Sequence, residues 1–281
     1  MNKELKPDCS ILIFNFNESE SCITTIKNLL ENPISKKFNI LVADDGSSDT
    51  KINELVEICR KHKIEFITGK NLGTFGNLCR AIKKIETNFI TFQSSTDILD
   101  VQTTLELLRI KKLKALNVVI FPFLESKQEI EFNSYSTRHI TPKCTGIKFL
   151  DKYILNKFNI GSTGGGIYPV KPLKRVLEQA EISDRYLMED WICNFLLSQE
   201  NIRFLQINRI NYKYIQQLNN LGITTNKINL KYEIAKTQEL IAKLSGKKKF
   251  KVSRMRDRIF EVIYVLSERR IISTVHSWIL R

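Results

Sequence analysis

The sequence has few of the residues from which metal clusters and disulfide frameworks are built. It contains three histidines and six cysteines, no two cysteines form a CxxC pair, and no histidine stands at a metal-ligand spacing from them. We therefore expect reduced, mostly buried thiols, as in a cytosolic protein.

Long hydrophobic runs are also missing. The longest apolar runs fall far short of the roughly 20 residues that a membrane-spanning helix needs. The stretch MNKELKPDCSILIF has no apolar signal-peptide region after its lysines. We expect a cytoplasmic protein that does not cross a membrane by itself.

What the sequence does have is a large excess of positive charge. Its 281 residues carry 44 Lys and Arg against 30 Asp and Glu, a net charge of +14. Hydrophobic residues make up 42% of the chain, so one large domain with its own core, or one domain with an appendage, is expected. The charge favours a polyanionic partner, such as a nucleic acid, an anionic membrane or a phosphorylated substrate.

Short apolar segments alternate with amphipathic ones over the first hundred residues. Strands are predicted at 9–14, 38–43, 65–68 and 88–92, and helices at 19–32, 50–63, 75–85 and 101–113. This alternation predicts an α/β fold with a parallel sheet covered by helices on both faces.

The remaining segments predict a second half and an extension. Strands are expected at 117–123 and 202–208, a short strand and a helix within 161–173, and helices at 186–199, 229–244 and 259–281. We divide the chain into a domain at 1–224, with halves of about 1–100 and 101–224, and a basic helical extension at 225–281.

Polar loops follow all four strands of the first half. They read NFNE, DDGSSD, GKNLGTFG and QSSTD, and in a parallel sheet such loops meet at one edge, where ligands bind. Turns also favour Asn, Asp, Gly and Ser. Turn chemistry accounts less well for acids converging from several loops, or for the adjacent carboxylates of Asp44 and Asp45, which repel each other.

These motifs, in this order, resemble family 2 glycosyltransferases of the GT-A fold over roughly residues 9 to 210. The matching pieces are NFNE, DDGSSD, NLG, SSTD, TGGGIY and Glu189-Asp190-Trp191. The resemblance implies a Rossmann-like, mostly parallel sheet flanked by helices. It also implies transfer of a sugar from a nucleotide-sugar, with uridine as the usual base.

The resemblance assigns the first half to donor binding. A carboxylate after the second strand would accept hydrogen bonds from a uracil-type N–H or from ribose hydroxyls. For Asp44 a turn cap is the alternative, although Asp49 fits that role better. The implied donor-binding residues are Asn15, Asn17, Glu18, Asp44, Asp45, Lys70, Asn71, Gly73, Asn77, Thr96 and Asp97.

The chain departs from the family at two places. The acids of the family's metal motif are replaced at Ser94 and Thr96, which leaves Asp97 as the predicted ligand for Mg²⁺ or Mn²⁺. His139 is a second candidate ligand, with simple solvation as its alternative. The family's Arg-Asn pair is replaced by Leu78 and Cys79, so Lys70 is expected to contact phosphate instead.

The resemblance places catalysis and acceptor binding in the second half. Asp190 is the predicted general base for an inverting transfer, and Glu189 is expected to orient the acceptor or Asp190. The alternative is that both acids merely stabilise a helix N-terminus. Gly164, Gly165, Gly166 and Trp191 are the predicted acceptor-binding residues.

The carboxyl-terminal extension is strongly basic. Lys and Arg crowd residues 247–258 beside an apolar helical face, a pattern that favours docking on an anionic membrane. The alternative is a helical appendage packed on the catalytic domain or on a second subunit. No zinc-finger or RNA-binding signature is present, so no nucleic-acid partner is expected.

The sequence thus predicts a hexosyltransferase acting on a glycan or lipid-linked acceptor in the synthesis of O-antigen, capsule or lipopolysaccharide. Its location would be peripheral, on the inner face of the cytoplasmic membrane. The alternatives are a degenerate member that binds a nucleotide-sugar or a partner without catalysis, and a nucleotidyltransferase. The second lacks support because NFNESES is not a Gly-rich, Arg-containing phosphate loop.

Overall fold

The structure is a computed structural model in which residues 7–109, 118–127, 164–178, 185–200, 202–215 and 227–244 are described. His139 and the basic residues 247–258 lie outside these ranges. Their predicted roles remain predictions.

The first half contains four strands that alternate with helices. The strands are β1 (Cys9–Asn15), β2 (Phe38–Asp44), β3 (Glu65–Ile67) and β4 (Phe89–Ser94). The helices are α1 (Ser19–Glu31), α2 (Ile52–Lys61), α3 (Gly73–Ala81) and α4 (Val101–Arg109), with 3-10 helices η1 (Pro33–Lys37) and η2 (Ile82–Lys84).

The second half adds strands that run in both directions. They are β5 (Ile98–Leu99), β6 (Val118–Lys127), β7 (Ile167–Pro169) and β8 (Arg203–Ile215). The helices are α6 (Val170–Glu178), α7 (Glu189–Gln199) and α8 (Lys227–Leu244).

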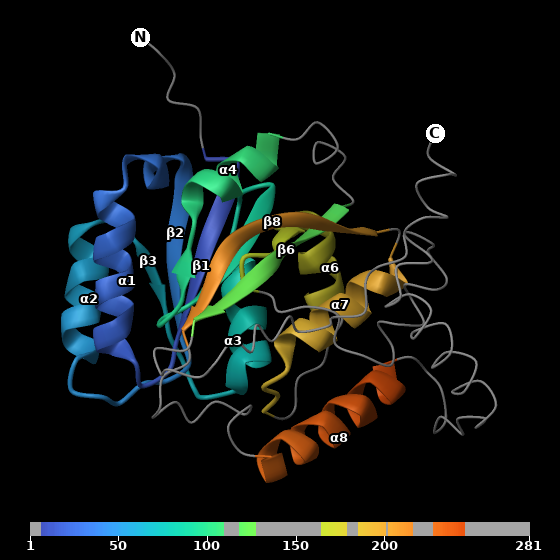
Figure 1. Ribbon diagram of the computed structural model, residues 1–281. Helices are drawn as coiled ribbons and strands as arrows, with labels where there is room; N and C mark the ends of the chain where they lie inside the picture. Colours follow the sequence, from blue (N-terminus) through green and yellow to red (C-terminus); the bar gives the residue numbers. More distant parts are fainter. Residues whose placement is uncertain are drawn as a thin grey trace. The chain divides into compact units, whose positions relative to one another are not determined.

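Within the described residues the strands form one mixed sheet in the order β3-β2-β1-β4-β7-β6-β8-β5 (Figure 1). The strands from β3 to β4 are parallel neighbours, β7 pairs antiparallel with β4 and β6, and β6 runs parallel to β8. The carboxyl ends of β1, β2 and β4 therefore lie at one edge. Their last residues stand level, with Asn15 opposite Asp44 and Phe14 opposite Ser94.

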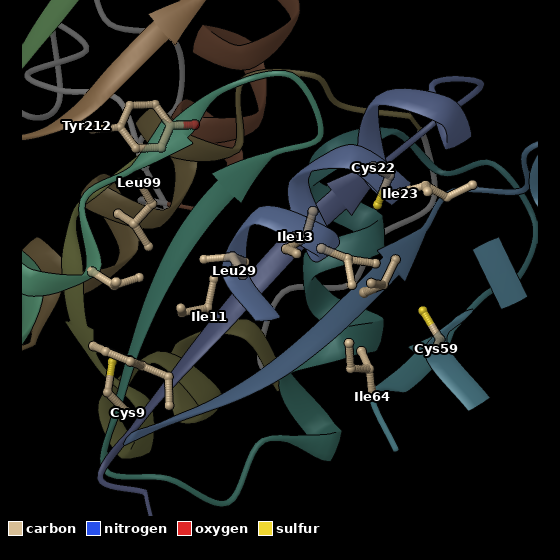
Figure 2. Packing of buried hydrophobic residues seen from close by; sticks show 14 of the residues in the cluster. Cys9, Ile11, Ile13, Cys22, Ile23, Leu29, Cys59, Ile64, Leu99 and Tyr212 are labelled. Atoms are coloured by element: carbon tan, nitrogen blue, oxygen red, sulfur yellow. The ribbon is translucent and has the colours of Figure 1, made fainter. Parts of the chain in front are cut away.

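The core shows why β1 is a strand covered on both faces. Cys9, Ile11 and Ile13 are buried in one cluster with Cys22 of α1 and Cys59 of α2 (Figure 2). Because side chains alternate along a strand, Leu12 faces the other way, and it is just as buried. Each such apolar side chain contributes about 1.5–3 kcal/mol by leaving water.

Helices cover both faces of the sheet. Helices α1 and α2 pack together on one side, while α3, α6 and α7 contact one another on the opposite side (Figure 1). The four predicted strands and four predicted helices of the first half are confirmed, with ends shifted by a few residues. The predicted α/β sheet flanked by helices is confirmed with them.

Some boundaries differ from the predictions. The helix predicted at 75–85 begins at Gly73 and tightens into η2 after Ala81. The helix predicted at 186–199 begins only at Glu189, and the Tyr186 carbonyl before it accepts the Phe75 N–H of α3. The last predicted strand extends to Ile215.

The chain divides into two compact units, Met1–Gln238 and Glu239–Arg281. The predicted division after residue 224 stays a prediction. No helix among the described residues is long and apolar enough to cross a membrane.

The described cysteines agree with the expectation from composition. Cys9, Cys22, Cys59, Cys79 and Cys193 are buried thiols. Burial raises the pKa of Cys59 to about 11 and that of Cys79 to about 12, so these thiols stay protonated at neutral pH.

Candidate functional site

Asp44, at the end of β2, is a buried hub of hydrogen bonds. Its Oδ1 accepts bonds from Asn15 Nδ2 at 2.9 Å and from the Ser47 hydroxyl. Its Oδ2 accepts from the main-chain N–H groups of Gly46 and Ser47, each at 3.1 Å, and from Thr68 Oγ1 at 2.8 Å. The side chain is 1% exposed. Asp44 therefore ties together the loops that follow β1, β2 and β3.

Asp45 stands next in the chain but has different surroundings. Its Oδ1 accepts the main-chain N–H of Leu72 at 2.9 Å. Burial raises the pKa of this carboxyl, while the main-chain N–H groups of Leu72 and Gly73 and the positive charges of Arg80 and Arg185 lower it. A carboxylate with one oxygen on a protein N–H and two cations nearby is suited to accept hydrogen bonds from a polar ligand.

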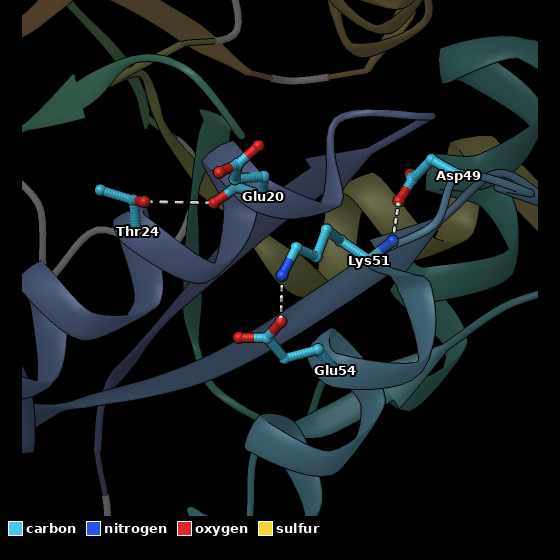
Figure 3. Close-up of polar contacts among 5 residues, drawn as sticks. All are labelled: Glu20, Thr24, Asp49, Lys51 and Glu54. Atoms are coloured by element: carbon cyan, nitrogen blue, oxygen red, sulfur yellow. Dashed lines mark hydrogen bonds and ion pairs between the residues drawn. The ribbon is translucent and has the colours of Figure 1, made fainter.

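The loop between the two aspartates and α2 is held in one conformation. Gly46 has a φ of +80°, and a Cβ there would meet the Gly69 carbonyl at 2.7 Å, so only glycine fits. Asp49 Oδ1 accepts the Lys51 N–H at 2.9 Å, just before α2, and Lys51 pairs with Glu54 (Figure 3). This agrees with the expectation that Asp49 serves the turn.

The end of β4 is joined to β8 by a buried tyrosine. The Tyr212 hydroxyl accepts the main-chain N–H of Ser94 at 3.0 Å and donates to Asp97 Oδ2 at 2.6 Å. Asp97 and Tyr212 are each 3% exposed. Burial, together with the charge and acceptor of Asp97, raises the pKa of Tyr212, so the tyrosine keeps its proton and acts as the donor.

The predicted glycine loop packs against the same residues. Gly165 donates its N–H to Phe92 at 3.0 Å. A Cβ on Gly164 would lie 2.6 Å from the Tyr212 ring. The loop therefore lies beside β4 near its carboxyl end, and its glycine leaves room for Tyr212 to reach Asp97.

The residues at the end of β4 fit a divalent cation poorly. Mg²⁺ and Mn²⁺ prefer carboxylate oxygens, but Ser94 and Thr96 provide hydroxyls, and one oxygen of the buried Asp97 accepts a hydrogen bond from the Tyr212 hydroxyl. In the part of the chain that the structure describes, no three His, Cys, Asp or Glu side chains form a group that could hold a metal ion.

The predicted catalytic acids lie in the first turn of α7. Glu189 and Asp190 are half-buried there, and Asp190 Oδ1 accepts the Trp191 N–H at 2.7 Å. The Glu189 charge also contributes to the raised pKa of Tyr212, after burial and Asp97. The Trp191 side chain is buried.

The other predicted donor residues are of two kinds. Asn15 and Asn77 are buried and hold main chain or loops, since Asn77 Nδ2 donates to the Ala43 carbonyl at 2.8 Å. The second kind is half-buried or exposed and consists of Asn17, Glu18, Lys70, Asn71 and Thr96. Of these, Glu18 accepts the Ser95 hydroxyl and Asn17 accepts the Ser48 N–H at 2.9 Å.

Sequence reasoning missed three residues of this edge. Arg185 lies with its guanidinium carbon 5.9 Å from the centre of the Phe16 ring, and Phe16 is 40% exposed. Tyr212 holds Asp97 from 115 residues away. For Phe16 a signal was available, because it stands inside the NFNE motif. No local sequence pattern marked Arg185 or Tyr212 as site residues.

Comparison with known proteins identifies one family. The model for glycosyl transferase family 2 matches residues 10–177. An uncharacterized glycosyltransferase of Rickettsia bellii is 26% identical over 175 residues, which are 60% of this chain and 21% of that protein. One of Rickettsia conorii is 37% identical over 90 residues, or 32% of this chain and 15% of that protein. The chain thus matches only a small part of each relative.

Solved structures show the same fold. A fragment of S. aureus TarS in complex with UDP-GlcNAc superposes with a TM-score of 0.53 and 17% identity, covering 76% of this chain and 59% of that chain. The same fragment in complex with UDP superposes with a TM-score of 0.53 and 19% identity. That match covers 85% of this chain and 64% of the TarS chain. Identities this low support the fold alone.

The family match covers more than half of the chain and includes the loops that follow β1, β2, β3 and β4. The fold adds the same parallel strands with their polar edge. The chain belongs to glycosyl transferase family 2 and has the GT-A fold.

Proposed function

We propose that the chain transfers a hexosyl group from a UDP-linked sugar to a glycan or lipid-linked acceptor in surface polysaccharide synthesis. The observation that carries this proposal is the contrast between Asp44 and Asp45. The carboxylate of Asp44 accepts five hydrogen bonds from the protein, whereas Asp45 Oδ1 accepts the Leu72 N–H and the carboxyl lies near the positive charges of Arg80 and Arg185.

The donor would bind across the carboxyl edge of the sheet. Asp45 would accept a hydrogen bond from the base or ribose, with Asn17, Asn71 and Lys70 around the nucleotide. Asn15, Asp44 and Asn77 would act by holding the loops. The TarS fragment binds UDP-GlcNAc and UDP in its solved complexes, which supports uridine as the base.

Asp190 would be the general base. As an acceptor hydroxyl attacks the anomeric carbon, a new C–O bond forms and the bond from that carbon to the diphosphate breaks. The hydroxyl proton passes to the Asp190 carboxylate, and the nucleoside diphosphate leaves. Attack from the face opposite the nucleotide inverts the anomeric configuration. Glu189 would orient the acceptor.

The acceptor would lie over the glycine loop. The packing of Gly164 against the Tyr212 ring and of Gly165 against Phe92 would fix this loop beside β4, where the donor is proposed to bind. Gly166 and Trp191 would complete the acceptor site. Docking of the basic extension on the inner face of the cytoplasmic membrane would bring a lipid-linked acceptor near.

The experiment that tests the proposal is nucleoside diphosphate release from UDP-glucose, UDP-galactose and UDP-GlcNAc, with EDTA or with Mn²⁺. We expect release from one of them, and a rate lower by about 100-fold or more in Asp190→Asn with UDP affinity unchanged. Glu57→Gln, an exposed acid on α2, is the control. The EDTA arm tests whether Asp97 serves Mg²⁺ or Mn²⁺, which stays a prediction from the resemblance.

One observation supports the alternative function, which is nucleotide-sugar binding without catalysis. The Asp97 carboxylate is engaged by Tyr212 and the family's other motif acids are replaced at Ser94 and Thr96, which favours a degenerate protein that binds a nucleotide-sugar without catalysis. UDP binding without release from any sugar nucleotide would establish that alternative.

A further inference from the structure

The helix that carries an Arg-Asn pair in many members of the family has neither residue at the matching positions here. Leu78 and Cys79 are buried in α3. The neighbouring Arg80 donates from Nη1 to the Asp44 carbonyl at 3.3 Å and from Nη2 to the Lys70 carbonyl at 2.6 Å. Arg80 therefore supports the main chain of two loops.

A second arginine reaches the same place from the other half of the protein. Arg185 lies just before α7, and two successive main-chain carbonyls are held there. Its carbonyl accepts a hydrogen bond from Lys236 Nζ, and the next carbonyl, that of Tyr186, accepts the Phe75 N–H at 3.2 Å. The Tyr186 ring also packs edge-on against Phe75 at 6.5 Å. The main chain from which the Arg185 side chain extends is therefore held against the beginning of α3.

The Arg185 side chain extends from this anchor over the loop that binds Asp45. A Cβ on Gly73 would lie 2.8 Å from Arg185 Cγ, and the residue before Gly73, Leu72, donates its N–H to Asp45 Oδ1. The guanidinium group then lies over the exposed ring of Phe16, 5.9 Å from its centre. The charge of Arg185 also acts on Asp45, where it opposes the rise in pKa that burial causes.

An acceptor carboxylate beside a donor guanidinium matches one pattern on the edge of a nucleobase. Uracil, thymine and guanine present a ring N–H next to a carbonyl, so the N–H can donate to a carboxylate and the carbonyl can accept from an arginine. Cytosine and adenine present the reverse, a ring nitrogen acceptor next to an amino group. The exposed Phe16 ring adds an aromatic face on which a base can stack.

We propose that Arg185 is a base-reading residue, which selects nucleotides with an N–H beside a carbonyl by donating to that carbonyl while Asp45 accepts the N–H. This inference rests on the proposed nucleotide-sugar function and adds the residue that would discriminate between bases. It makes a segment of the acceptor half part of the donor pocket.

The test is a calorimetric comparison of UDP and CDP, which share ribose and diphosphate and differ only in the base edge. GDP and ADP form a second such pair. Wild type should bind UDP or GDP about tenfold or more tightly than its partner. In Arg185→Gln that preference should fall about tenfold, because the favoured nucleotide loses a charged hydrogen bond and the other loses nothing.

Two further variants serve as controls. Arg60→Gln, on the exposed surface of α2, should leave both affinities unchanged. Arg185→Lys should keep part of the preference because it keeps one charged donor. A thermal unfolding curve of each variant without ligand checks that it is folded. If Arg185→Gln does not fold, the loss of base preference is measured in Arg185→Lys instead.

The outcomes separate this inference from the proposed function. Equal losses for UDP and CDP in Arg185→Gln would place Arg185 on the shared diphosphate and overturn base reading. Unchanged affinities, or a wild type that prefers CDP or ADP, would also overturn it while leaving nucleotide binding intact. A wild type that binds none of the four nucleotides would overturn the proposed function itself.

Discussion

The ends of β2 and β4 lie at the same edge of the sheet, yet their acidic residues have different surroundings. At the end of β2, Asp44 accepts hydrogen bonds from donors of three loops, while its neighbour Asp45 accepts the main-chain N–H of Leu72. At the end of β4, Asp97 is buried and bound by Tyr212.

This difference shows that the role of a motif acid depends on what surrounds it. A carboxylate already satisfied by protein donors stabilises the loops, and truncating it leaves buried donors without an acceptor. A carboxylate with fewer protein donors has capacity left for a ligand. The comparison predicts stability effects at Asp44 and at the Tyr212–Asp97 pair, and binding effects at Asp45.

The largest loss of stability is expected for Asp44→Asn. The substituted amide would turn an N–H₂ group toward donors such as Thr68 and Gly46, so the free energy of unfolding should fall by about 2–4 kcal/mol. Urea unfolding at pH 7 measures this. Asp45→Asn is the matched control, one residue away, and equal losses in the two variants would break the comparison.

A smaller loss is expected for Tyr212→Phe. Removing the hydroxyl takes a donor from the buried Asp97 carboxylate and an acceptor from the Ser94 N–H, at a cost of about 2 kcal/mol. Tyr168→Phe is the control, because the Tyr168 hydroxyl is equally buried but donates to the uncharged Asn194 amide at 3.2 Å. Its cost should be about 1 kcal/mol. The reverse order in urea unfolding would refute a charge-assisted bond at Asp97.

The smallest effect concerns the pH dependence of stability. Burial raises the pKa of Asp45 in the folded protein, so the folded state holds this proton to a higher pH than the unfolded chain, whose pKa is about 3.9. The free energy of unfolding therefore falls as pH rises from that value through the folded pKa.

Asp45→Asn removes this proton and so should gain stability relative to wild type over the same pH interval. Unfolding curves at a series of pH values from acid to neutral would show a widening difference in favour of the variant. A difference that narrows with rising pH would mean that the native environment of Asp45 lowers its pKa.

Periodicity was enough to predict the sheet and its helices, because each strand and helix of the first half carries its own apolar pattern. The division of roles at the site could not be predicted in this way. Asp44 and Asp45 share one motif, and what separates them is Asn15, 29 residues before Asp44, and Thr68, 24 residues after it. These are tertiary contacts with no local signature.

The same reason explains the missed residues. Tyr212 lies beyond the end of the strand predicted at 202–208, and only the pairing of β8 with β5 and β6 brings it to Asp97. Arg185 lies just before the helix predicted at 186–199. The neighbouring Tyr186 carbonyl accepts the Phe75 N–H of α3, and the Arg185 guanidinium lies over the Phe16 ring.

The most direct test of the central claim is a calorimetric titration of UDP into wild type and Asp45→Asn. The account predicts that wild type binds UDP and that the variant binds it about tenfold to a hundredfold more weakly, with no loss of thermal stability. Equal affinity in the two proteins would contradict the claim that Asp45 receives the donor nucleotide.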